Sequence, residues 1–133
     1  YRRVMWETTI GIIQQVPLLG VGSGSYALEY SKVAKASENP WRAFESDDPH
    51  QQYLLIAAEQ GLIGLFIFVI FICSWLRKPS TYYEVFGLAI LLGIMCTSLF
   101  NGHFGSFVEG RLVFLSMGAL IGVGGASFIG GKK

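Results

Sequence analysis

Three long apolar runs limit what this chain can fold into. They cover about residues 54–76, 84–101 and 111–130. A helix of about 20 apolar residues is long enough to cross the hydrocarbon core of a bilayer. The sequence is 52% hydrophobic and only 14% charged, which is too apolar for an ordinary soluble domain of 133 residues. We therefore expect an all-α integral membrane protein, with an outward-facing helical loop region (residues 1–50) followed by a membrane domain of three transmembrane helices (residues 51–133). A buried soluble helical hairpin is the alternative.

Two basic clusters predict the orientation of the chain in the bilayer. Arg77-Lys78 follows the first apolar run and Lys132-Lys133 follows the third. Because Lys and Arg are enriched in cytoplasmic loops, both clusters and the C-terminus are expected in the cytoplasm, and residues 1–50 on the outer side. The formal net charge of +1 gives no basic footprint for nucleic acid, so the expected environment is the lipid bilayer.

The outer region is expected to contain two short helices joined by a turn. Residues 1–16 are predicted to form an amphipathic helix that ends at Pro17. A glycine-rich turn follows. The polar residues 27–49 carry mixed charges, which indicate an extramembrane loop with a short helix around 26–36.

His50 stands where the outer loop meets the first apolar run. Asp48 is a good N-cap, Pro49 suits the first helical position, and Gln51 completes a capping box. The sequence therefore predicts His50 in the first turn of a long apolar helix. Free backbone N–H groups and the positive end of the helix dipole gather there. This pattern predicts an anion site at a membrane surface with a titratable base inside it.

Three elements, in the same order, resemble the O-antigen ligase and O-antigen polymerase superfamily. The first is Arg2, four residues before Trp6. The second is the proline-then-glycine turn that begins at Pro17. The third is His50-Gln51, followed after nine residues by a Gly-x-x-Gly. The glycines of the last two elements are Gly20, Gly22, Gly24, Gly61 and Gly64.

The resemblance implies that the chain is the C-terminal part of a larger multi-span glycosyltransferase of the bacterial inner membrane, with residues 1–50 in the periplasm. Members take a glycan from an undecaprenyl-diphosphate carrier and pass it to an acceptor hydroxyl. The acceptor is lipid A-core for a ligase and a second glycan chain for a polymerase; protein O-oligosaccharyltransferases form a related branch. The resemblance implies no cofactor and no metal. Without the spans that the chain lacks, we expect it to be inactive on its own.

The resemblance also assigns roles to charged residues. Arginine binds phosphate oxygens through a planar fork that is always charged, so Arg2, with Arg3 beside it, is the expected diphosphate ligand. Its alternative role is a solvated or headgroup-binding base. His50 is the expected catalytic residue, either as a general base toward the acceptor hydroxyl or as an N–H donor to the diphosphate. Its alternative role is a helix-capping or interfacial histidine.

Two further features allow other interpretations. Asp47 and Asp48 form an acidic pair of the kind that holds a divalent ion in some glycosyltransferases, although capping already accounts for Asp48. Glu59 lies inside the first apolar run and is expected to face protein rather than lipid. A protein of a different class, a non-catalytic membrane assembly or transport subunit, would need only the spans. The joint presence of Arg2, the glycine turn and the His50 spacing argues against it.

Overall fold

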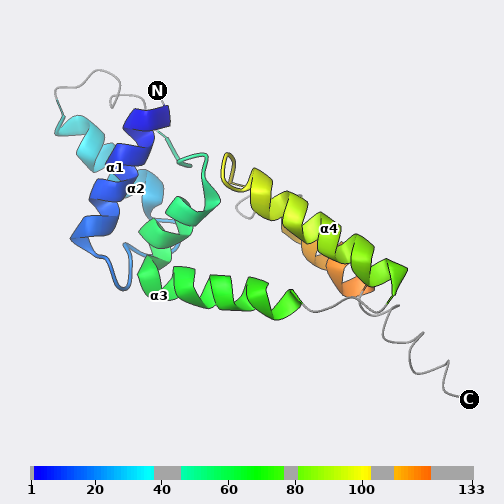
Figure 1. The fold of residues 1–133 in the computed structure, drawn as a ribbon. Coiled ribbons are helices and arrows are strands. Elements are labelled where there is room, and N and C mark those ends of the chain that lie inside the picture. Colours follow the sequence, from blue (N-terminus) through cyan, green and yellow to red (C-terminus); the bar gives the residue numbers. More distant parts are fainter. Residues whose placement is uncertain (1, 38–45, 77–80, 103–109, 121–133) are drawn as a thin grey trace, which may run out of the picture.

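The computed structural model describes residues 2–37, 46–76, 81–102 and 110–120, and these ranges form helices and no strand, as the sequence predicts. Figure 1 shows two groups of helices, one built around α1 and α2 and the other around α4. The helices are α1 (Arg2–Gln15), α2 (Tyr26–Lys35), α3 (Gln52–Trp75), α4 (Tyr82–Thr97) and an unlabelled helix, Gly110–Leu120.

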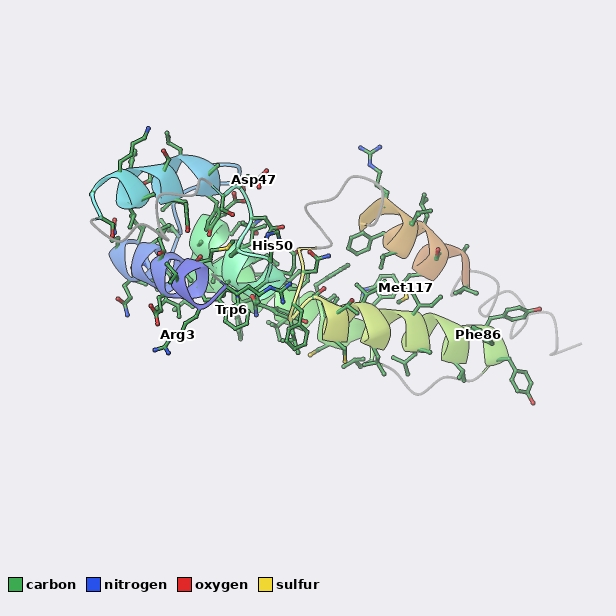
Figure 2. All side chains as sticks on the ribbon, turned by 90° about the horizontal axis from the view of Figure 1, so that it is seen from above. Arg3, Trp6, Asp47, His50, Phe86 and Met117 are labelled. Atoms are coloured by element: carbon green, nitrogen blue, oxygen red, sulfur yellow. The ribbon has the colours of Figure 1, made fainter. Side chains whose placement is uncertain are left out.

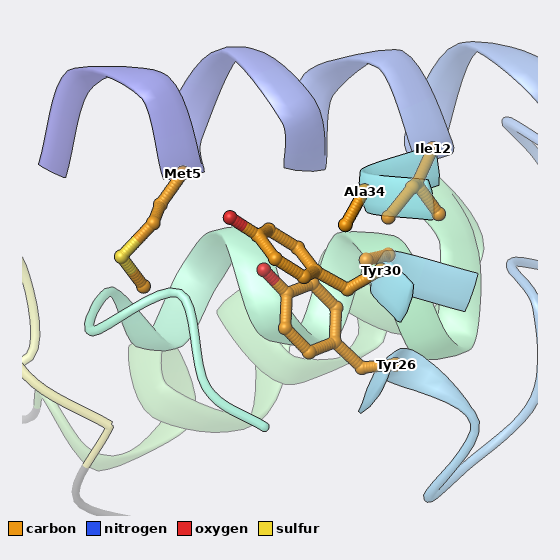
Figure 3. Close-up of a cluster of buried hydrophobic side chains, with 6 residues drawn as sticks. Met5, Ile12, Tyr26, Tyr30 and Ala34 are labelled. Atoms are coloured by element: carbon orange, nitrogen blue, oxygen red, sulfur yellow. The ribbon is translucent and has the colours of Figure 1, made fainter. Parts of the chain in front are cut away.

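The two N-terminal helices form where the sequence predicts them, with α1 ending just before Pro17 and α2 falling on the predicted short helix. Both helices pack against the first half of α3 around a shared core. Figure 3 shows the rings of Tyr26 and Tyr30 lying beneath α1. The hydroxyls of Tyr26 and Thr9 are hydrogen-bonded at 2.8 Å, so burial leaves neither group unpaired. Each fully buried large apolar side chain in this core, such as Met5 or Ile12, stabilises the fold by about 1.5–3 kcal/mol. The core residues are Met5, Ile12, Tyr26, Tyr30, Ala34 and Ala58.

The helix α3 is broken at Gly61. Its backbone there has φ 70° and ψ −175°, outside the helical region, and the second half of α3 turns sharply away from the first (Figure 1). The single uninterrupted helix expected over residues 54–76 is therefore wrong. The first half, up to Gln60, packs with α1 and α2. The apolar second half, Leu62–Trp75, is about 21 Å long at 1.5 Å per residue.

The described helices support one membrane crossing by length and composition, not three. Only α3 is both long and apolar enough, and only when its 24 residues are counted across the break at Gly61; α4 and the helix Gly110–Leu120 are apolar but shorter. The last part of the third expected span, residues 121–130, lies outside the described ranges. The prediction of three transmembrane helices is therefore not confirmed.

The surface of this second group is apolar rather than polar. A small cluster of Ile72, Leu91, Val113 and Met117 joins the helices, and Figure 2 shows Met117 lying against α4. Large side chains around it remain exposed, which is the opposite of a buried soluble hairpin. An apolar surface of this extent is covered by lipid or by further protein. Examples are Phe66 (65%), Ile67 (61%), Phe86 (69%) and Leu115 (70%).

Candidate functional site

The loop that carries His50 ends before α3 rather than inside it. The backbone N–H of His50 donates to Asp48 Oδ1 at 2.6 Å, and His50 adopts a left-handed conformation with φ 52°. The helix begins at Gln52, and its N-cap is Gln51, whose side-chain oxygen accepts from Leu54 N. The predictions that Asp48 caps the helix and that His50 lies in its first turn are therefore wrong. Asp48 instead closes a local turn onto the residue two positions ahead, an alternative that short acidic side chains offer the backbone.

The anion site expected at the start of α3 is largely occupied by the protein's own acceptors. Gln52 N donates to Ser98 O at 3.0 Å, and Leu55 N donates to Gln51 O at 3.1 Å. With Leu54 N held by the Gln51 side chain, few N–H groups of the first turn are left for a ligand. The His50 side chain is instead exposed beside the helix start.

Trp6 connects α1 to the His50 loop. Its Nε1 donates to Pro49 O at 3.1 Å, across 43 positions of the chain. Figure 2 shows Trp6 and His50 on the same part of the molecule. Arg2 precedes Trp6 by one helical turn and therefore shares its face of α1. The structure thus brings the helix that carries Arg2 against the loop that carries His50, with no direct hydrogen bond or ion pair between these two described side chains.

Arg3 is directed elsewhere. Its Nε lies 2.8 Å from Glu7 Oε1, one helical turn along α1, and its side chain is 91% exposed. In Figure 2 it points away from His50. Arg2 has no such partner among the described residues, which distinguishes the two arginines.

The end of α4 holds the other side of the His50 loop. Tyr53 donates its hydroxyl to Met95 O at 3.0 Å, next to the bond between Gln52 N and Ser98 O. Gly102 lies directly against the carboxylate of Asp48. No local sequence pattern predicts these contacts. The Asn101-Gly102 dipeptide is a turn signal, but a turn signal does not reveal what the turn will touch.

The two glycine motifs meet at the break in α3. The turn after α1 inserts its backbone there: Val21 N donates to Ala58 O at 2.9 Å, and Leu62 N donates to Pro17 O at 2.8 Å. A Cβ on Gly20 would lie 2.5 Å from the backbone of Glu59, and one on Gly61 would overlap the backbone of Leu18.

The remaining motif glycines lie in the same neighbourhood. Gly22 and Gly24 belong to the turn, and both have positive φ angles. Gly64 follows the break, where a Cβ would collide with the Gln60 side chain. The close neighbours of Gly61 and Gly64 are thus a turn and the helix's own side chain rather than a second helix.

Glu59 contacts another helix, as expected for a carboxylate in an apolar run. Its Oε1 accepts from Tyr26 N at 3.3 Å, at the start of α2. A negative charge at a helix N-terminus interacts favourably with the helix dipole. Glu59 therefore connects the break in α3, where Gly20 and Gly61 lie, to α2.

The acidic pair of the loop is divided between two environments. Asp47 is exposed, whereas Asp48 is half-buried and bonded to the His50 backbone. Across the described ranges, no three His, Cys, Asp or Glu residues gather as a metal site would require.

A known protein family matches the part of the chain that contains these elements. The sequence profile described as O-antigen ligase matches residues 1–69. The chain belongs to the O-antigen ligase family. The matched segment runs from α1 through the glycine turn, α2 and the His50 loop into α3 beyond its break. This family is membrane-associated and uses lipid-linked glycans and acceptor substrates. Comparisons with curated proteins and with solved structures find no match.

Proposed function

We propose that this chain is the C-terminal part of an O-antigen ligase, a glycosyltransferase that moves a glycan from an undecaprenyl-diphosphate carrier to a hydroxyl of lipid A-core. One observation carries the proposal: the bond from Trp6 Nε1 to Pro49 O holds the helix of Arg2 against the loop of His50. This contact joins two of the three family motifs at a common surface.

Arg2 is proposed to bind the diphosphate of the donor. Its guanidinium is exposed and unpaired among the described residues, whereas Arg3 is already paired with Glu7. A planar guanidinium binds two phosphate oxygens at once and stabilises the negative charge that collects on the diphosphate as it departs. Arg3 is proposed as an auxiliary group that has to break its ion pair before it contributes.

His50 is proposed to act on the acceptor. The acceptor oxygen attacks the anomeric carbon of the glycan, the bond from that carbon to the diphosphate oxygen breaks, and its electron pair leaves with the diphosphate. The acceptor proton passes to the imidazole. The left-handed backbone of His50 supports this role because it places the side chain outside α3. The imidazole is exposed there and has no hydrogen-bond partner among the described residues. Donation of an imidazole N–H to the diphosphate is the second role open to the same atoms.

The proposed topology places residues 1–50 in the periplasm and the C-terminus in the cytoplasm of the inner membrane. The proposed membrane domain, residues 51–133, packs with further spans of the complete protein. An O-antigen polymerase or a protein O-oligosaccharyltransferase of the same superfamily would use the same residues, and the acceptor distinguishes them.

The test uses the complete gene in a strain that lacks it, with surface glycans separated on a gel. Deletion is expected to give uncapped lipid A-core and accumulated carrier-linked polymer, whereas single-unit caps would identify a polymerase. Arg2→Ala and His50→Ala are expected to reproduce the deletion at normal protein abundance. Arg3→Ala is the matched control on the same helix and should retain most of the capping. Normal capping by the His50→Ala protein would remove His50 from the reaction and overturn the proposal.

A further inference from the structure

Asp48 joins two parts of the chain that lie far apart in the sequence. One carboxylate oxygen, Oδ1, accepts from His50 N at 2.6 Å. The other side of the carboxylate lies against Gly102, where a Cβ would overlap Oδ2 and would lie 2.9 Å from Cγ. The space that Asp48 occupies therefore exists only because residue 102 has no side chain.

The neighbouring bonds fix the same arrangement. Gln52 N donates to Ser98 O at 3.0 Å, so the start of α3 is attached to the end of α4. On the opposite side, Trp6 Nε1 holds Pro49 O. His50 lies between these attachments, and the bond from its own N–H to Asp48 is the one that supports its left-handed backbone.

We infer that Asp48 and Gly102 are positioning residues for glycan transfer: the Asp48 carboxylate holds the His50 backbone, and Gly102 leaves room for that carboxylate. This inference rests on the proposed function, because it needs His50 to meet the substrate. It extends the site beyond the family match, which ends at residue 69, to the segment Ser98–Gly102.

Asp48 acts here as a hydrogen-bond acceptor, and its charge is not what the geometry uses. The side-chain oxygen of an asparagine accepts the same bond. Asp48→Asn should therefore retain transfer within about twofold, whereas Asp48→Ala should lower kcat about tenfold or more with little change in the KM for the donor. A purely structural role would lower the amount of folded protein and would not separate kcat from KM.

A double-mutant cycle tests the contact between the two residues in the complete protein. Gly102→Ala alone should lower kcat about tenfold or more, because its methyl group displaces the carboxylate. In the Asp48→Ala background the same methyl group enters vacated space, so the double variant should be no slower than Asp48→Ala alone. Rates are taken per molecule of accumulated protein. Independent losses that add in the double variant, or a Gly102→Ala protein with normal kcat, would overturn the inference.

A disulfide cross-link tests the contact between Asp48 and Gly102 without an activity measurement. With Cys73 and Cys96 replaced by Ser, an Asp48→Cys/Gly102→Cys protein should form a disulfide under mild oxidation, and an Asp47→Cys/Gly102→Cys protein should form far less. Absence of the first cross-link would overturn the contact. His50→Ala, measured in parallel, separates the two proposals: if it is fully active, the proposed function fails, and if it is inactive while the cycle is additive, only the positioning role fails.

Discussion

Gly20 and Gly61 face each other across two backbone segments that leave no room for a side chain on either residue. Gly20 lies against the carbonyl of Glu59, and Gly61 lies against the backbone of Leu18. Four backbone hydrogen bonds surround the pair, two donated by Val21 and Gly22 to Ala58 and Glu59, and two donated by Leu62 and Ile63 to Pro17 and Leu18.

Gly61→Ala is expected to destabilise the protein by well over 1 kcal/mol, because the positive-φ extended backbone at this position alone costs about 1–3 kcal/mol for a residue with a Cβ and the new methyl group also meets backbone. Thermal unfolding in detergent measures the loss. Gly11→Ala in the middle of α1 is the matched control, since a Cβ there meets nothing within 4 Å. It should be neutral or stabilising by about 0.5–1 kcal/mol. Equal stability of the two variants would contradict the close backbone packing at Gly20 and Gly61.

Trp6→Phe is expected to lower transfer while leaving the protein folded. The substitution keeps an aromatic ring and removes the N–H that holds Pro49 O. A lost hydrogen bond of this kind costs about 0.5–1.5 kcal/mol. Trp75→Phe, in the second half of α3, is the control and should leave transfer unchanged. The prediction fails if both variants transfer glycan at the native rate.

Arg2→Lys is expected to raise the KM for the lipid-linked donor, because an ammonium group cannot reproduce the two parallel bonds of a guanidinium to phosphate. Arg3→Lys should change the KM little, since an exposed i,i+4 ion pair contributes about 1 kcal/mol or less. Donor titrations with both variants make the comparison, and a larger effect at Arg3 than at Arg2 would reverse the assignment.

Glu59→Ala is expected to destabilise the outer region by about 1 kcal/mol, the usual cost of losing a side-chain acceptor at a helix N-terminus. Glu59→Gln keeps an acceptor for Tyr26 N and should lose less. Protection of the α2 amides from hydrogen exchange reports the difference. The same protection in both variants would show that Glu59 does not stabilise the start of α2.

Transfer is expected to continue in excess EDTA, because the proposed reaction neutralises the diphosphate with arginine. The measurement is the capping rate in membranes before and after chelation. Loss of activity that Mg²⁺ restores would contradict this prediction and would favour a metal site that includes Asp47 or residues outside the described ranges.

Local patterns predicted the outer helices well, because their limits depend on neighbouring residues. Pro17 removes an N–H and ends α1, and the polar stretch after the glycine turn carries α2 where expected. The family motifs also identified Gly20 and Gly61 from spacing alone, without revealing that the two residues touch.

The sequence did not predict the break in α3 or the conformation of His50. An apolar run of this length favours a continuous helix even with the two glycines Gly61 and Gly64, and the groups that stabilise a break at Gly61 come from a turn about 40 positions earlier. At Asp48 two local hydrogen bonds compete, an N-cap and a turn onto His50, and contacts with Gly102 and Ser98 accompany the second. Such long-range contacts leave no trace in a local pattern.

A bend in a helix normally strands carbonyl and N–H groups, and hydrocarbon offers them no substitute for water. In this chain the turn between α1 and α2 supplies backbone partners at the break: Ala58 O and Glu59 O accept from it, and Leu62 N and Ile63 N donate to it. An apolar polypeptide therefore changes direction here with hydrogen bonds that its own backbone supplies in place of solvent.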